Sequence, residues 1–171
     1  APLFGRDLCE QFVGLEFLSM GEDPQLRVRK EAVSNLASIG KIVSPTFSNK
    51  DSYPFLKVAN FKKFTNSRLC KDVNWGVRKS CIDSIYDIAN ICKDDLSEHK
   101  ETELTEAVLA FLKDANKWVK ISAYKNLGPF ISTLQGLKIN EKLIENYLRM
   151  VDSSVNNLSP DNEVADFLMN N

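Results

Sequence analysis

A pattern of 14 residues occurs three times along the chain and constrains its fold more than any other feature. Each copy has Asp, four variable residues, Val, a cation, two further residues, a small side chain, a larger apolar one, two polar residues and then Leu or Ile. The copies occupy residues 23–36, 72–85 and 114–127, so they begin 49 and then 42 residues apart. Repetition of this kind is typical of chains built from stacked supersecondary units.

Each copy has the features of an amphipathic helix with a marked beginning. Its Asp suits an N-terminal turn, where a carboxylate accepts backbone N–H groups and faces the positive end of the helix dipole. Apolar residues then recur every three or four positions, which places them on one helical face. These apolar stripes are Val28, Ala32, Leu36, Ile39 and Val43; Val77, Cys81, Ile85, Ile88 and Cys92; and Val119, Ala123, Leu127, Phe130 or Ile131, and Leu134.

A second apolar-striped segment precedes each copy, at about residues 6–19, 55–70 and 102–112. Each pair of segments predicts a helical hairpin, and such hairpins bury both apolar faces only by stacking. Because the period is close to the roughly 40 to 47 residues of HEAT units, we predict an all-α HEAT-repeat solenoid in one array. Its predicted units are repeat 1 at about 4–43, repeat 2 at about 53–93, repeat 3 at about 102–135, and a partial repeat or cap at about 139–169.

The segments between the hairpins differ in composition from the helices. Residues 44–54 are rich in Ser, Pro, Asn and Asp, and residues 93–101 are highly charged, so both are predicted to be exposed connections. A fourth unit begins near Asn140, and residues 159–168 have the pattern of a short closing helix with Pro in its first turn. The apolar face expected for the fourth unit is Leu143, Ile144, Tyr147, Leu148 and Val151. Because the chain opens without Met and enters helical pattern at once, we expect a piece of a longer array.

The composition argues against nucleic acid and membranes as partners. Lys and Arg number 22 against 23 Asp and Glu, a formal net charge of -1, so no positive excess attracts a phosphate backbone or an acidic lipid surface. No apolar run approaches the roughly 20 residues that a membrane-spanning helix needs. The four cysteines lie among aliphatic residues instead of at disulfide-framework spacings, which indicates reduced thiols and a cytoplasmic or nuclear location.

The usual local patterns of catalytic and metal sites do not occur. The chain has no Gly-rich phosphate loop, no His-Glu-x-x-His and no G-x-S-x-G, and its one histidine, His99, is predicted to be an ordinary surface residue. Cys70, Cys81 and Cys92 could approach one another, but the close cysteine pairs of zinc sites are missing. Since Cys81 occupies the small-residue position of the pattern, we predict that the cysteines are core residues and bind no metal. Because the catalytic and phosphate-binding motifs are missing, we also predict no cofactor and no enzymatic activity.

Charged residues recur with the repeat. Arg29, Arg78 and Lys120 occupy its cation position, and an Asp opens every copy. In a stack, such side chains can reach from one hairpin to the next and form a ladder of charge-assisted hydrogen bonds. For the repeating charges, we favour this structural role over contact with a partner protein. Partner contact is favoured more for the non-repeating cations, which are Arg27, Lys30, Lys79 and Lys117.

Trp75 and Trp118 both lie just before the Val and cation of the pattern, which predicts a place in the turn between the two helices of a hairpin. An aromatic side chain there either folds back as a local staple or stands on the edge of the array as an interface anchor, where Trp is enriched. The sequence leaves both roles open.

Two stretches resemble successive repeats of the HEAT-repeat regulatory subunit 1 family of protein phosphatase 4. The first is Asp-Val-Asn-Trp-Gly-Val-Arg-Lys-Ser-Cys at residues 72–81, and the second runs from Trp118-Val-Lys through Leu-Gly-Pro-Phe-Ile-Ser-Thr at residues 127–133. More distantly, the chain is similar to the scaffold subunit of protein phosphatase 2A. The resemblance covers about residues 4–135, and the run at 127–133 is its most specific part.

The resemblance implies a non-catalytic scaffold that holds a phosphatase 4 type catalytic subunit, modulates its activity or targeting, and accommodates further regulatory subunits. In the related phosphatase 2A scaffold, the catalytic subunit docks on the turns within hairpins. Lys120 stands where the family usually has Arg, which weakens a bidentate contact there. Carried onto the matching positions, the protein-binding residues are Arg27, Trp75, Arg78, Lys79, Lys117 and Trp118.

Two other classes of function compete with this interpretation. A HEAT-repeat adaptor of another family, for nuclear transport or complex assembly, would share the fold and bind cargo or a small GTPase. A HEAT-fold enzyme or nucleic-acid binder would require a cluster of catalytic groups or a strongly basic concave face, and the near-neutral charge argues against it.

Overall fold

The protein is described by a computed structural model over residues 12–43, 69–91, 98–134 and 139–156. Within these ranges the regular structure consists of helices, without a strand, which confirms the predicted all-α class. The helices are α2 (Gly14–Met20), α3 (Leu26–Val43), α5 (Trp75–Ile91), α6 (Glu98–Phe111), α7 (Lys117–Thr133) and α8 (Glu141–Asn156).

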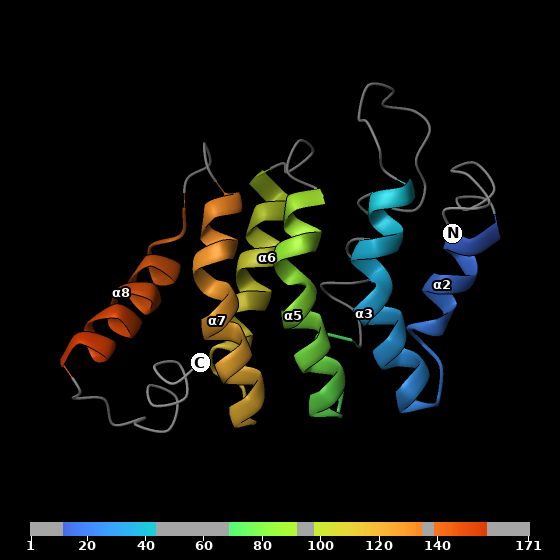
Figure 1. Ribbon diagram of the computed structural model, residues 1–171, viewed down its shortest axis with the longest axis horizontal. Helices are drawn as coiled ribbons and strands as arrows, with labels where there is room; N and C mark the ends of the chain where they lie inside the picture. Colours follow the sequence, from blue (N-terminus) through green and yellow to red (C-terminus); the bar gives the residue numbers. More distant parts are fainter. Residues whose placement is uncertain (1–11, 44–68, 92–97, 135–138, 157–171) are drawn as a thin grey trace.

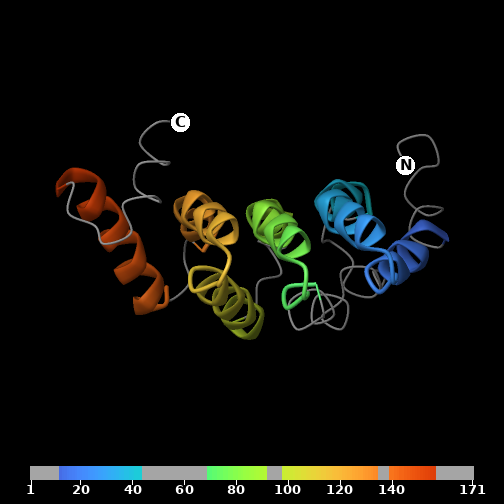
Figure 2. The ribbon, with the colours of Figure 1, turned by 90° about the horizontal axis from the view of Figure 1, so that it is seen from below.

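The helices form an elongated, two-layered array. α3, α5 and α7 stand side by side in one layer, with their N-terminal ends along the lower edge in Figure 1. α2 and α6 lie in a second layer, and α8 stands beyond α7 at the end of the array (Figure 2). This arrangement is compatible with a helical solenoid.

Two predicted hairpins are present within the described residues. α2 and α3 are joined by residues 21–25, and α6 and α7 by residues 112–116. The connection predicted at 44–54, the closing helix predicted at 159–168, and Cys9 and Cys92 lie outside the described residues. The helix predicted at 55–70 lies outside them up to residue 68, and its last two residues, Leu69 and Cys70, are in a turn instead of a helix.

The start of α6 differs from the prediction. This helix begins at Glu98, so the expected charged connection at 93–101 is wrong for its last four residues, and His99 lies in the first helical turn instead of a loop. The segment Glu-His-Lys-Glu contains neither Gly nor Pro, and acidic residues are favourable at a helix N-terminus. High charge alone therefore does not indicate a connection.

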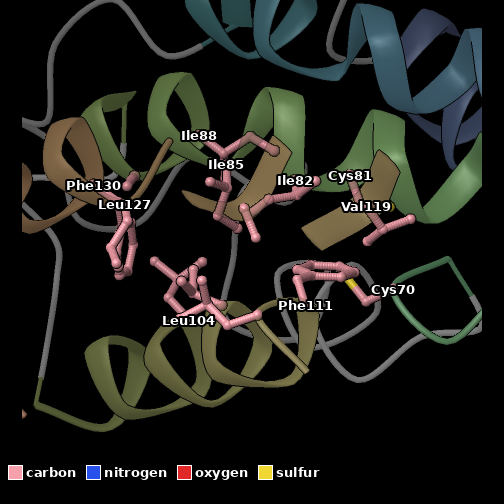
Figure 3. Packing of buried hydrophobic residues seen from close by; sticks show 14 of the residues in the cluster. Cys70, Cys81, Ile82, Ile85, Ile88, Leu104, Phe111, Val119, Leu127 and Phe130 are labelled. Atoms are coloured by element: carbon pink, nitrogen blue, oxygen red, sulfur yellow. The ribbon is translucent and has the colours of Figure 1, made fainter. Parts of the chain in front are cut away.

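The predicted stripes of α5 and α7 lie in one continuous core, to which α6 also contributes, with Val33 and Ala37 of α3 and Leu143 of α8. On α3, the predicted stripe residues Ala32, Leu36 and Ile39 lie in a second cluster with Phe17 of α2. On α8, only Leu143 of the predicted apolar face is buried, and Ile144, Tyr147, Leu148 and Val151 are exposed. α6 contributes Leu104 and Phe111, which point toward residues of α5 and α7, with Phe111 beside Cys70 and Val119 (Figure 3). On α7, Phe130 is fully buried and Ile131 only partly, which decides the alternative that the sequence left open. The stripe residues of α5 and α7 that are fully or almost fully buried are Val77, Cys81, Ile85, Ile88, Val119, Ala123, Leu127, Phe130 and Leu134.

The cysteines that the structure describes are core residues, as predicted. Cys70 and Cys81 are both buried free thiols. Burial raises the pKa of the Cys81 thiol far above its ordinary value, and a hydrogen bond with Cys70 adds to the effect. No group of ligands that could hold a metal ion occurs among the described residues, and within them no helix is both long and apolar enough to cross a membrane.

α7 continues through a Gly-Pro pair that would ordinarily weaken a helix, since Pro lacks an N–H donor and Gly has a low helix propensity. Tertiary packing explains the exception. Leu127 and Phe130, on either side of the pair, are fully buried, and a Cβ atom on Gly128 would lie 3.2 Å from Cε2 of Tyr147 in α8. Gly128 therefore leaves room for Tyr147 where α8 packs against α7.

Candidate protein-binding edge

The N-terminal ends of α3, α5 and α7 form an edge that we call the turn edge, defined as residues 23–30, 72–79 and 114–120. Its backbone is shaped by short hydrogen bonds. The carboxylates of Asp23, Asp72 and Asp114 accept the backbone N–H two residues ahead, at 2.7, 2.8 and 2.8 Å. Each Asp thus closes its turn, as its preference for N-terminal turns predicts.

In the second and third copies, an asparagine continues this chain of turn hydrogen bonds. The amide oxygens of Asn74 and Asn116 accept the N–H groups of Gly76 and Trp118, at 2.8 and 3.0 Å. Asn116 is the N-cap of α7. In these copies the residue that caps the helix is therefore an Asn, two residues after the Asp. The repeat pattern did not reveal this position, because Asp and Asn are both favourable at a helix N-cap.

The predicted charge ladder is present between neighbouring copies. Arg29 donates from Nε to Asp72 Oδ2 at 2.7 Å and from Nη2 to Oδ1 at 3.2 Å. Arg78 repeats the arrangement with Asp114, at 2.7 and 2.8 Å. Both pairs are bidentate and mostly buried, the geometry in which an Arg-carboxylate pair is strongest.

Each arginine also holds its own turn. Arg29 Nη1 donates to the carbonyl oxygens of Asp23 and Pro24, at 2.9 and 3.0 Å. Arg78 Nη1 donates in the same way to the carbonyls of Asp72 and Val73, at 2.7 and 3.3 Å. Each guanidinium therefore joins two backbone carbonyls of its own turn to the Asp carboxylate of the following turn. An ammonium group lacks this planar fork.

The ladder holds its carboxylates in the charged form. A hydrogen bond from Arg78 lowers the pKa of Asp114 below its ordinary value against the opposing effect of burial, and the Asn116 N–H and the charges of Arg78 and Lys120 assist. Burial would raise the pKa of Asp72, but hydrogen bonds from Arg29 and the Asn74 N–H, with the charges of Arg29 and Arg78, lower it.

These depressed pKa values predict a loss of stability in acid. Above the pKa of an unfolded Asp, about 3.9, the ladder contributes fully. As the pH falls below that value, the unfolded chain binds protons first, so the free energy of unfolding declines until the lower folded pKa is passed. Urea midpoints measured between about pH 6 and pH 2.5 should show this decline. In Asp114→Asn the free energy of unfolding should fall less steeply as the pH is lowered. A fall as steep as that of the parent chain would contradict the lowered pKa of Asp114.

Trp75 and Trp118 lie in the first helical turns and not in the connecting turns, where the sequence placed them. Trp75 is the first residue of α5 and Trp118 the second residue of α7. Both remain on the surface, with 44% and 41% of their area exposed. Lys117 places its Nζ 5.6 Å from the centroid of the Trp118 ring, a cation–π contact.

The remaining candidate residues divide into two kinds. Arg27 is exposed on the first turn of α3. Arg78 is committed to the ladder, and Lys79 is paired with Asp83 at 2.6 Å one turn further along the helix. The turn edge thus contains all six predicted residues, but Arg78 and Lys79 are in ion pairs within the chain, and Lys117 and Trp118 contact each other.

Two exposed apolar residues of the turn edge were missed by sequence reasoning. Val73 is almost completely exposed in the turn before α5, and Leu26 is exposed as the first residue of α3. Leu26 stands in the same register as Trp75, three residues after the Asp, and this alignment was the signal that could have identified it.

The chain is 30% identical over 134 residues to serine/threonine-protein phosphatase 4 regulatory subunit 1 of Mus musculus and of Rattus norvegicus, and 27% identical to that of Homo sapiens. The match covers 78% of this chain, which spans 13% of the length of those relatives. No protein-family model and no solved structure matches. The chain is thus similar, over most of its length, to a segment of a phosphatase 4 regulatory subunit.

Proposed function

We propose that this chain is a non-catalytic HEAT-repeat segment of a phosphatase scaffold, which binds the catalytic subunit of a phosphatase 4 type enzyme and modulates its activity or targeting. The observation that carries the proposal is the identity of 27–30% over 134 residues to serine/threonine-protein phosphatase 4 regulatory subunit 1. The cytoplasm, the nucleus or both are its proposed location.

The geometry of the turn edge supports a binding role. Trp75, Trp118 and Val73 offer exposed apolar area, and Lys117 places positive charge beside the Trp118 ring. Arg27 is exposed on the same edge, in the first turn of α3. Exposed Trp together with Arg is the composition of protein-interface hot spots. The ladder fixes the backbone beneath these side chains, so a partner meets a preformed surface and loses little entropy in ordering it.

The proposed partner chemistry combines apolar pockets with acidic groups. Two half-exposed indole rings fit hydrophobic depressions on a partner, and the cations beside them favour carboxylates at the rim. A groove between α6 and α8 is lined by Glu106, Lys113, Lys142, Glu145 and Arg149 with smaller residues. Since acids and bases alternate there, the groove lacks the single sign of charge that would mark it as a site for one ionic ligand.

The experiment is a binding measurement between the chain and a phosphatase 4 catalytic subunit. We expect co-elution in size-exclusion chromatography at micromolar concentration. Trp118→Ala and Trp75→Ala should each weaken the complex by about 30-fold, which corresponds to about 2 kcal/mol for a hot-spot residue. Circular dichroism should show that the helical content is unchanged.

The matched control is Phe12→Ala, which also removes an exposed aromatic ring but lies outside the turn edge. Its affinity should equal that of the parent chain. Absence of co-elution would overturn the proposal. If Trp118→Ala lowered the melting temperature by many degrees instead of the affinity, Trp118 would be a local staple and not an anchor.

A further inference from the structure

α8 carries an exposed apolar stripe at the end of the array, beyond α7 (Figures 1 and 2). Ile144, Tyr147 and Leu148 are 40%, 37% and 53% exposed. Their spacing of three and four residues places them on one side of the helix. The neighbouring side of α8 is packed, since Leu143 is fully buried in the core and Tyr147 lies close to Gly128 of α7. The stripe is therefore apolar surface that the described helices leave open to solvent.

Three acidic residues border this stripe on one side. Glu141, Glu145 and Asp152 are all exposed, and their spacing of four and seven residues places them on a common side of α8, next to Leu148. None of the ion pairs within the described part of the chain includes them. We call the stripe and these three acids together the α8 surface. It combines apolar side chains with carboxylates that have no counter-charge in the described ranges.

The cations of α8 lie on a different side of the helix. On a helix of 3.6 residues per turn, Glu141 and Asp152 are about 60 and 80° around the axis from Ile144, whereas Lys142 and Arg149 are about 160 and 140° away. Lys142 and Arg149 line the groove that α8 forms with α6. The border of the stripe is therefore negative, although α8 as a whole carries both signs of charge.

The occupant that suits the α8 surface is a helix. The side chains of α8 offer no backbone hydrogen bonds to an extended segment, whereas a helix satisfies its own N–H and C=O groups. Apolar side chains spaced three and four residues apart form ridges that pack into the grooves of a second helix. Elsewhere in the array, the apolar faces of α5, α6 and α7 are buried against one another in the same way.

The acidic border selects among the helices that could bind. A second copy of α8 in an antiparallel two-fold pair would bring Glu145 and Asp152 of one copy against the same acids of the other, and like charges across an interface are unfavourable. A helix with Lys or Arg beside its apolar stripe would instead place cations against these carboxylates. Charge complementarity therefore favours a basic amphipathic helix over a second copy of this chain.

We propose that the α8 surface is a docking site for an amphipathic helix of another protein, with Lys or Arg along the border of its apolar stripe. Ile144, Tyr147 and Leu148 receive its apolar side chains, and the three acids pair with its cations. No residue of the α8 surface belongs to the turn edge, so this proposal does not depend on the function proposed for that edge.

Two synthetic peptides of about 18 residues, or five helical turns, test the proposal on the complete chain. Both have Leu at spacings of three and four residues, and the positions beside the Leu stripe are Lys in one peptide and Glu in the other. In fluorescence anisotropy, the Lys peptide should bind at least about 10-fold more tightly, because three acids contribute to the contact. Raising the salt from about 0.1 to about 1 M should remove most of this difference, since the Debye length falls from about 10 to about 3 Å.

Variants of α8 locate the site. Leu148→Ser removes the most exposed side chain of the stripe and should weaken binding of the Lys peptide at least about 10-fold, with an unchanged circular dichroism spectrum. The triple variant Glu141→Lys, Glu145→Lys and Asp152→Lys should reverse the preference, so that the Glu peptide binds more tightly. The matched control Glu31→Lys changes an exposed acid on α3 and should leave both affinities as in the parent chain.

Three results would overturn the proposal. The first is equal affinity of the parent chain for the two peptides, or the absence of binding by either. The second is unchanged binding of the Lys peptide to Leu148→Ser. The third is a dimer that forms with rising protein concentration in analytical ultracentrifugation and is lost in Leu148→Ser, which would assign the stripe to a second copy of the chain.

Discussion

Asp114→Ala should lower the free energy of unfolding by about 3 kcal/mol, near the lower end of the cost of breaking a buried ion pair from one side. Arg78 would keep its hydrogen bonds to the carbonyls of Asp72 and Val73 but lose both bonds to a carboxylate. The substitution also removes the turn hydrogen bond from Asn116. Urea denaturation followed by circular dichroism measures the loss.

Asp23→Ala is the matched control for this prediction. Asp23 accepts the same turn hydrogen bond, from the N–H of Gln25, but no arginine in the part of the chain that the structure describes donates to its carboxylate, which acts on Arg29 only through its charge. We expect a loss of about 1 kcal/mol, the value of one hydrogen bond. The difference between the two losses in free energy of unfolding gives the contribution of the Arg78–Asp114 pair. Equal losses would show that this pair contributes nothing.

Phe111→Ala should cost about 4 kcal/mol, because it removes a large buried side chain and leaves a cavity between α5, α6 and α7. Phe111 is the last residue of α6 and lies beside Cys70 and Val119, so it fills the space where the hairpin meets the next helix (Figure 3). Calorimetric or urea unfolding measures the change.

Phe12→Ala provides the control of identical chemistry, since Phe12 is 64% exposed. Its effect should remain within about 0.5 kcal/mol. If the two substitutions were equally mild, Phe111 would not be part of the core that joins the repeats.

Periodic features were predictable from the sequence because each of them is repeated at equivalent positions in several copies of the pattern. The stripe of α5 and the ladder pairs of Arg29 and Arg78 recur at fixed positions, so single departures do not hide them. The choice between Phe130 and Ile131 was not predictable, since both lie close to the same face of α7 and only packing distinguishes them.

Features set by a single local contact escaped prediction. The need for a glycine at position 128 arises from the close approach of Tyr147, which lies 19 residues further along the sequence. The positions of Trp75 and Trp118 within first helical turns depend on asparagine caps that resemble turn residues. At the binding edge, sequence reasoning found the aromatic residues and placed Arg78 in the ladder, but it did not show that Lys79 is paired with Asp83.

The planar arginines of the ladder have a mechanical consequence. Because Arg29 and Arg78 each link two carbonyls on one side to a carboxylate on the other, the separation of consecutive turns is fixed along that edge. A protein that binds two turns at the same time therefore meets them at a constant separation, without a prior rearrangement of the array.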